Sequence, residues 1–315
     1  MKNRNYPIDA VITWVDGNDI QHKAKRMKYG NNAIFKAEDV GGSTRFTSVG
    51  EIFYCVASIH RFAPWINKIY IVTDEQNPHV ETLIGKNFYR QIPIEIVDHK
   101  TIFRGYEEYL PTFNCNPIEM HLHCIEGLDE EFLYFNDDMY PMLPCKSEDF
   151  FREGKGIIGM SRHWFPSNMY KHICRNSDRL ARKALGQRPT WAFLRPQHIC
   201  SPLLKSECEA LYATIEQEIK SSLTRIRTKD DLNQYLFLDY MYLKGKIINQ
   251  RQSKKHFSVG VASSHKLFDF IIHPTRKLAC INDVQLTEEK YIELRENILS
   301  AFEERFPQKS KFEIS

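Results

Sequence analysis

Long hydrophobic runs and cysteine pairs are absent from this sequence. No stretch of about 18 apolar residues occurs, so we expect no transmembrane helix. The opening residues, MKNRNYPIDAVITWVDGND, combine a short apolar stretch with an early acid, which argues against a signal peptide. The eight cysteines show no C-x-x-C pair and no zinc-site spacing, which favours free thiols in a reducing compartment. We therefore expect a cytoplasmic protein without disulfides.

Glycine, proline and net charge are also low. Gly and Pro number 14 each in 315 residues, which excludes collagen-like and low-complexity chains. The formal net charge is only +3, which gives no reason to expect a nucleic-acid partner. Hydrophobic residues make up 42% of the chain and aromatic residues 12%, enough for a sizeable core. The length allows one large α/β domain or two smaller ones.

Four short apolar runs in the N-terminal half predict strands, and each is followed by an acid. They span residues 8–15, 69–73, 92–97 and 132–135. Helical spacing at 46–62 and 116–125 alternates with them, which predicts a Rossmann-like α/β fold with a mostly parallel sheet and helices on both faces. Ligands of such sheets bind beyond the carboxyl ends of the strands. The four acids therefore indicate a site, although Asp is also a common turn residue.

Residues 152–195 differ in charge from the rest of the chain. They contain ten basic and two acidic side chains, a local net charge of +8, so the remainder carries −5. This basic segment could cover the site and attract an anionic substrate, or form a peripheral membrane-facing surface. A solvated insertion without a specific partner is the alternative.

The C-terminal half is predicted to be mainly helical. Ser201 and Pro202 fit the N-cap and first position of one helix. Thr228 and Asp231 resemble a capping box that opens a second helix, with Gly245 after its end. A last helix is predicted over 287–306.

Asn136, Asp137 and Asp138 directly follow the fourth predicted strand. Two carboxylates and an amide oxygen form a hard oxygen cluster that suits Mg²⁺ or Mn²⁺ beside a diphosphate. Asn282 and Asp283, just ahead of the last helix, could supply another ligand. A turn with local side-chain caps is the alternative for both groups.

The first predicted strand ends in the sequence W-V-D-G-N-D. Asp16 lies at the end of this strand, and Gly17 allows the backbone to turn sharply or to approach a ligand closely. Trp14 could flank a base or sugar ring, but strand alternation could equally bury it in the core.

Glu119 and His198 each allow a structural and a catalytic interpretation. Glu119 fits the third position of a helix with Asn116 as N-cap and Pro117 as N1, so capping alone explains it. His198 precedes the helix predicted at Ser201, whose positive end favours a neutral imidazole. Near a phosphate, a neutral imidazole can accept a hydroxyl proton.

Arg225 and Arg227 precede the next predicted helix start, where cations oppose the helix dipole. An arginine there fits best if a phosphate lies between it and the helix. Pairing with Asp230 or Asp231 is the alternative.

Taken in order, these motifs resemble the Stealth family. This family comprises bacterial capsular polysaccharide sugar-phosphotransferases and the animal N-acetylglucosamine-1-phosphotransferase of lysosomal enzymes. Four blocks resemble the family, at 8–19 (IDAVITWVDGND), 44–140 (including STRF, APWINKIYIVTDEQNP and FLYFNDDM), 195–242 (with RIRTKDDLN) and 280–313 (with CIND and FPQKSKFE). The resemblance covers nearly the whole chain except the basic segment.

The resemblance implies a GT-A-like Rossmann core, a nucleotide-sugar substrate and a divalent metal. It also implies functional roles for Asp16, Arg45, Glu119, Asp137, Asp138, His198, Arg227 and Asp283. On this basis 1–315 is one catalytic domain, with a nucleotide-sugar-binding half at 1–150, the basic segment, and a helical half at 196–315 that completes the site.

The resulting hypothesis is transfer of hexose 1-phosphate from a nucleotide-diphosphate sugar to a glycan hydroxyl. Asp137, Asp138 and Asp283 would organise Mg²⁺ or Mn²⁺, and His198 would be the general base, with Glu119 as its competitor. Asp16, Trp14 and Gly17 would contact the donor, and Arg227 and Arg45 its phosphates. The main rival is a glycosyltransferase that releases a nucleoside diphosphate. A non-catalytic sugar-binding protein is a further alternative.

Overall fold

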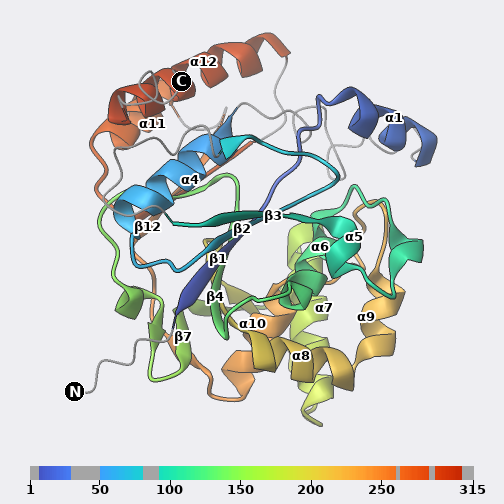
Figure 1. The fold of residues 1–315 in the computed structure, drawn as a ribbon. Helices are drawn as coiled ribbons and strands as arrows, with labels where there is room; N and C mark the ends of the chain where they lie inside the picture. The colour runs from blue at the N-terminus through green and yellow to red at the C-terminus, as the bar shows by residue number, and fades with distance from the viewer. Residues whose placement is uncertain (1–6, 30–49, 81–91, 260–262, 284–287, 307–315) are drawn as a thin grey trace.

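The computed structural model describes residues 7–29, 50–80, 92–259, 263–283 and 288–306. Its centre is a five-stranded sheet in the order β10-β4-β1-β2-β3 (Figure 1). The strands are β1 (Ile8–Thr13), β2 (Ile69–Thr73), β3 (Ile94–Asp98), β4 (Glu131–Asn136) and β10 (Ser201–Leu204). The first four run parallel and β10 runs antiparallel to β4. The predicted mostly parallel α/β sheet is therefore confirmed, with strand bounds shifted by one or two residues.

Helices cover both faces of this sheet (Figure 1). On one face lie α4 (Glu51–Phe62), α11 (Ser264–Ile272) and α12 (Glu288–Arg305). The rings of Tyr54 in α4 and Phe302 in α12 stack with centroids 4.7 Å apart. On the other face lie α6 (Cys115–His121), α8 (Lys205–Thr214) and α10 (Tyr235–Leu243), with α9 (Glu216–Ser222) after α8. The strands β1, β2, β4 and β10 are buried between these layers and form the core, whereas β3 at the edge of the sheet buries only Val97.

The predicted helix start at Ser201 and Pro202 is wrong. Both residues lie in β10, where Pro202 pairs with Leu133 of β4, and α8 begins only at Lys205. Proline is tolerated there because β10 is the edge strand of the sheet. The second predicted helix also begins later than expected, since α10 starts at Tyr235 and not near Asp231. Gly245 follows its end with a φ of +72°, as predicted.

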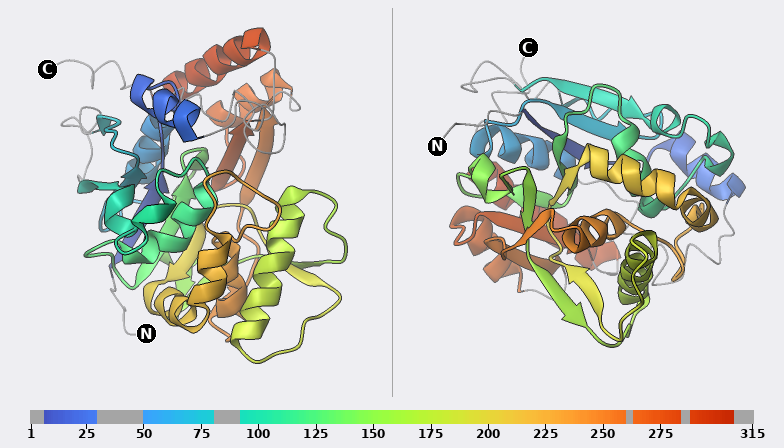
Figure 2. Two further views of the ribbon diagram at one scale, coloured as in Figure 1. Left: turned by 90° about the vertical axis from the view of Figure 1, so that its right-hand side faces the viewer. Right: turned by 90° about the horizontal axis from the view of Figure 1, so that it is seen from below.

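The basic segment forms regular structure. It contains β7 (Lys155–Ile158), β8 (Met160–His163), α7 (Met169–Ala184) and β9 (Phe193–Pro196), with β6 (Phe151–Arg152) at its start. β8 and β9 pair antiparallel and project from the body of the molecule (Figure 2). Cys174 and Ala181 of α7 are fully buried in the core. This segment is therefore integrated with the rest of the fold.

Two further three-stranded sheets complete the fold. One has the order β11-β7-β6, with β11 at Ile247–Asn249, and the other has the order β12-β13-β5. Here β5 is Met139–Pro141, β12 is Lys254–Val259 and β13 is Leu278–Asp283. Because β5 follows β4 after a two-residue turn, this sheet brings β13 beside the end of β4.

The surface carries a few large apolar side chains. Trp164, Phe165 and Trp191 are 64%, 82% and 93% exposed and adjoin the β8–β9 pair. Within the described residues, no helix is both long and apolar enough to cross a membrane. All eight cysteines are free thiols, as expected.

Candidate active site

The carboxyl ends of β1, β2, β3 and β4 meet at one edge of the central sheet. This follows from their parallel pairing, and it brings the acids after the four strands to the same edge, as predicted. The structure separates these acids into two groups by the partners that each carboxylate has.

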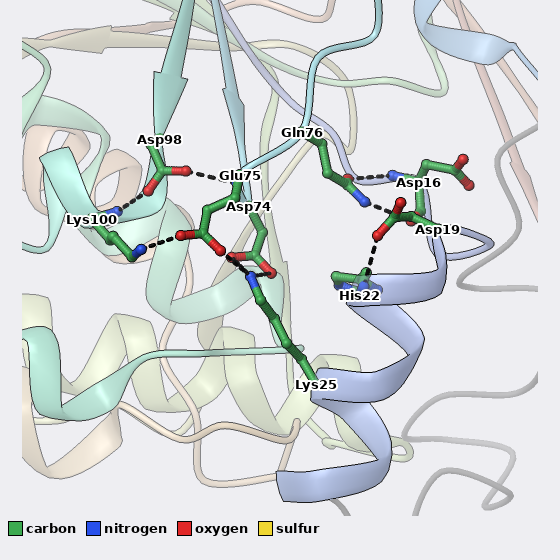
Figure 3. Close-up of polar contacts among 9 residues, drawn as sticks. All are labelled: Asp16, Asp19, His22, Lys25, Asp74, Glu75, Gln76, Asp98 and Lys100. Carbon is green, nitrogen blue, oxygen red and sulfur yellow. Dashed lines mark hydrogen bonds and ion pairs between the residues drawn. The ribbon is translucent and has the colours of Figure 1, made fainter.

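The acids after β2 and β3 are engaged in ion pairs and backbone caps (Figure 3). Lys25 of α1 (Ile20–Tyr29) donates to Asp74 at 3.0 Å and to Glu75 at 2.7 Å. Glu75 also pairs with Lys100, and Asp98 accepts from the Glu75 and Lys100 backbone amides. These contacts fix α1 and α5 (His99–Ile102) to the sheet edge, so a structural role accounts for these acids.

Asp16 is positioned by Gln76 from the end of β2 (Figure 3). The Gln76 side chain accepts from the Asp16 amide at 2.8 Å and donates to the Asp16 carbonyl at 2.9 Å. One carboxylate oxygen of Asp16 accepts from the Asn18 amide. Gly17 is buried and its carbonyl accepts from Arg26. Trp14 is only 8% exposed, which matches its interpretation as a core residue better than a contact with a base or sugar ring.

Asp138 has one carboxylate oxygen that is buried without a partner. Its Oδ1 accepts no hydrogen bond, whereas Oδ2 lies 3.8 Å from the Cys280 thiol. Its carbonyl accepts from the Ile281 amide of β13 at 2.9 Å. Burial raises the pKa of Asp138 to about 6, because the charged form loses its hydration. A bound cation would satisfy both the open oxygen and the charge.

The predicted metal set is only partly described. Asp137 and Asp138 lie in the turn after β4, and Asp283 is the last residue of β13, but its side chain lies outside the described residues. Arg45 also lies outside them. Among the side chains that are described, no three His, Cys, Asp or Glu residues gather in a group suited to a metal ion.

Glu119 is not the capping residue that its position predicted. Asn114, two residues earlier than expected, caps α6 by accepting from the Asn116 amide. Glu119 instead is 4% exposed and accepts from the Tyr134 hydroxyl at 3.2 Å and the Gln234 amide at 3.1 Å. Burial raises the pKa of Glu119 to about 7, although these hydrogen bonds and Arg227 oppose the shift. This is the range in which a carboxylate exchanges protons near neutral pH.

The loop that carries Arg227 is anchored by Asp231, which is fully buried. The Asp231 carboxylate accepts hydrogen bonds from four side chains. Two lie at the start of α6, Asn114 and Asn116, and two lie in the same loop as Asp231, Thr224 and Thr228. Arg227 donates to the Cys115 thiol at 2.6 Å and interacts electrostatically with Glu119 and Asp231. Arg225 donates to backbone carbonyls of Glu108 and Leu110. The Asp231 carboxylate also accepts from the Thr228 amide at 3.1 Å, as the predicted capping box requires, but no helix begins there and the contact anchors the loop.

His198 follows β9, is half-buried, and shares a hydrogen bond with a tyrosine. Its Nδ1 lies 2.8 Å from the Tyr235 hydroxyl, which also accepts from Tyr170 at 2.7 Å. Burial lowers the pKa of His198 to about 3, and nearby cations and His256 add to the effect. The imidazole is therefore neutral, as predicted, but the cause is burial and neighbouring charge, since no helix begins at Ser201.

A series of contacts, some through space and some along the chain, leads from the end of β4 to His198 and from there back to Asp138. It passes in order through Asn136, Tyr134, Glu119, Gln234, Tyr235, His198, His256, Asn282, Cys280 and Asp138. Its widest step through space is 5.8 Å, between the ring centroids of His198 and His256. This path connects the predicted Glu119, Asp138 and His198, and Arg227 interacts electrostatically with both Glu119 and His198.

Comparison with known proteins agrees with these motifs. Stealth protein CR1, conserved region 1, matches residues 6–33, and Stealth protein CR2, conserved region 2, matches residues 45–158. The capsular polysaccharide phosphotransferase fcs1 of Haemophilus influenzae is 34% identical over 92% of this chain and 82% of its own length. The chain belongs to the Stealth family.

Other relatives differ from this chain in length. An exopolysaccharide phosphotransferase of Streptomyces coelicolor is 33% identical over 98% of this chain, which spans 57% of that protein.

Among solved structures, mouse xyloside xylosyltransferase 1 covers 88% of this chain and 98% of its own at 11% identity, with a TM-score of 0.37. Of the site residues, Asp16 lies in the first Stealth region and Glu119, Asp137 and Asp138 in the second.

Several residues of the site were not found from the sequence. In the sequence, Tyr134 has the pattern of a core residue in an apolar strand, and Tyr235 has the pattern of a residue in an apolar helix. Lys254 donates to the His198 carbonyl at 2.7 Å, yet it lies 56 residues away. Only the tertiary fold brings these residues to the site, and no local spacing signals them.

Proposed function

We propose that this chain is a sugar-phosphate transferase of surface polysaccharide synthesis. It moves hexose 1-phosphate from a nucleotide-diphosphate sugar to a hydroxyl group of a glycan acceptor. The observation that carries this proposal is the series of contacts that links the carboxylate of Asp138, Glu119, Arg227 and His198 in a Stealth protein. The names of the relatives, which are capsular and exopolysaccharide phosphotransferases, support phosphoryl transfer as the reaction.

In the proposed reaction, the acceptor oxygen attacks the sugar-proximal phosphorus of the donor. A new oxygen–phosphorus bond forms, and the bond from that phosphorus to the bridging oxygen breaks. The bridging oxygen leaves with the bonding electrons as part of the nucleoside monophosphate. Positioning and charge stabilisation supply most of the acceleration of such transfers.

His198 is the proposed general base. When its Nδ1–H donates to Tyr235, Nε2 carries a lone pair that can take the hydroxyl proton. If Tyr235 instead donates to Nδ1, Nε2 carries the proton and can donate to a phosphate oxygen. The direction of the hydrogen bond with Tyr235 therefore decides whether His198 acts as a base or as a donor. Glu119 is the second candidate, and its pKa of about 7 suits proton exchange, but both its oxygens already accept hydrogen bonds.

Asp137, Asp138 and Asp283 are the proposed ligands of Mg²⁺ or Mn²⁺. The partnerless, buried Oδ1 of Asp138 supports this assignment. When bound, such an ion offsets the charge of the donor diphosphate. Asp16, which follows the neighbouring strand β1, is the proposed contact to the donor.

The leaving group tests the proposal. The full chain is incubated with a panel of nucleotide sugars, Mn²⁺ and glycan acceptors, and released nucleotides are separated by chromatography. We expect nucleoside monophosphate and a new phosphodiester signal by ³¹P spectroscopy. Release of nucleoside diphosphate would instead indicate the glycosyltransferase alternative, and binding without turnover would indicate a sugar-binding protein.

The metal assignment has its own test. Changing Asp137→Asn and Asp138→Asn together should abolish metal-dependent turnover and the heat of Mn²⁺ binding in calorimetry. The matched control is Asp149→Asn, because Asp149 pairs with Lys277 and is not one of the proposed metal ligands. Unchanged Mn²⁺ binding in the double variant would place the metal elsewhere.

A further inference from the structure

Three cations act electrostatically on His198. Arg195 lies in β9, Lys254 begins β12, and Arg227 lies in the loop before α10. Each of them interacts electrostatically with the imidazole. All three side chains are half-buried, so they are not free to extend into water.

Two of these cations lack a compensating carboxylate. Within the part of the chain that the structure describes, neither Arg195 nor Lys254 forms an ion pair. The Nε atoms of Arg195 and Arg227 are both buried without a hydrogen-bond partner. Buried donors without a partner are unfavourable, and a bound anion would supply one.

The surrounding contacts hold the cations in place. The Lys254 ammonium donates to the His198 carbonyl at 2.7 Å, and the Arg195 guanidinium lies 5.4 Å from the ring centroid of Tyr170. Tyr170 in turn donates to Tyr235, the partner of His198. The positive charge is therefore fixed beside the imidazole before any ligand arrives.

The same cations are connected to the carboxylate side of the site. Two residues after Lys254, His256 pairs in register with Cys280 of β13, whose thiol is 3.8 Å from Asp138. A group that spans the site would thus meet carboxylates near one end and cations near the other. A diphosphate with a metal ion has this distribution of charge.

We propose that Arg195 and Lys254, together with Arg227, form a phosphate-binding site beside His198 that holds the donor diphosphate. This inference rests on the proposed function for the identity of the donor. Arginine offers a planar fork of donors to phosphate oxygens, and lysine contributes a point charge.

The site also bears on the protonation of His198. Burial lowers the pKa of the imidazole, and the three cations add to this effect. A diphosphate bound to these cations would offset their share of the shift.

The test is binding of inorganic pyrophosphate to the full chain, measured by calorimetry in EDTA so that no metal contributes. We expect Arg195→Gln and Lys254→Gln each to weaken binding about 10-fold or more, the loss typical of a charged hydrogen bond. The controls are Arg162→Gln, from the strand paired with that of Arg195, and Lys255→Gln, since both residues are exposed. These should bind as the wild type does.

Two results would overturn the inference. One is equal pyrophosphate affinity in the wild type, the Arg195→Gln variant and the Lys254→Gln variant, and the other is no binding by the wild type. Circular dichroism checks the fold of each variant. If Arg195→Gln does not fold, Arg195→Lys keeps the charge without the planar fork and should show a smaller loss.

Failure of this inference is distinguishable from failure of the proposed function. If the variants lose pyrophosphate binding but the enzyme releases nucleoside diphosphate, the phosphate site stands and phosphoryl transfer is wrong. If the enzyme releases nucleoside monophosphate and the variants bind pyrophosphate normally, the reaction stands and the site is wrong.

Discussion

Glu119 offers the sharpest test of the electrostatics in this site. Its pKa of about 7, against the ordinary 4.5, means that the folded protein binds a proton more tightly than the unfolded chain. Below about pH 4 the group is neutral in both states and imposes no cost. As the pH rises, the unfolded chain ionises first, so the folded state loses stability until both states are ionised.

The size of this loss of stability follows from the pKa values of Glu119 in the unfolded and folded states. At about 1.4 kcal/mol per pKa unit, the full difference is about 3.5 kcal/mol, of which about 2.5 kcal/mol develops between pH 5 and pH 8. Glu119→Gln removes the ionisation. The amide still accepts one hydrogen bond but loses the other, a cost of about 1–2 kcal/mol that does not depend on pH.

The assay is urea unfolding of the wild type and Glu119→Gln at pH 5 and pH 8, with linear extrapolation to water. Relative to the wild type, the variant should gain about 2.5 kcal/mol between these pH values. Glu126→Gln, at an exposed residue just after the same helical segment, is the control and should show no such gain. An equal difference between wild type and Glu119→Gln at both pH values would refute the reasoning.

Three further predictions concern the base, the loop anchor and a buried acid. His198→Ala should lower turnover by ~10²–10⁴-fold, and Tyr235→Phe by a smaller factor, as measured by nucleotide release; near-native rates would exclude His198 as base. Asp231→Ala should lower the unfolding free energy by about 2–4 kcal/mol in urea, because four side-chain donors lose their acceptor; a change below about 1 kcal/mol would contradict its anchoring role. Asp239 is fully buried with both oxygens unpartnered, and burial raises its pKa well above the usual value. Asp239→Leu should therefore stabilise the protein more at pH 8 than at pH 5, and a pH-independent effect would show that the carboxyl ionises without cost.

The sheet could be predicted because its information is local. β1, β2 and β4 are short apolar runs. Because both faces of these strands are buried, their residues are apolar almost throughout, and the run itself identifies the strand. The strand β10 was missed because Ser201 and Pro202 also form a good helix start, and only pairing with β4 decides between the two. Tertiary pairing thus overrode a valid local signal.

The site was predictable in its carboxylates and less so in its partners. Acids at parallel strand ends share an edge by topology, so Asp16 and Asp138 could be placed together. The structural roles of Asp74 and Asp98 depend on Lys25 and Lys100, which spacing does not connect to them. The capping interpretation of Glu119 failed because its partners, Tyr134 and Gln234, lie on other elements.

The placement of the four tryptophans has a practical use. Trp14 is in the core and the Trp65 indole donates to the Cys145 carbonyl, whereas Trp164 and Trp191 stand in solvent beside the β8–β9 pair. A soluble quencher such as iodide will reach the second pair and spare the first. Intrinsic fluorescence can therefore be divided into a signal from the interior and a signal from one projecting sheet, without attaching any dye.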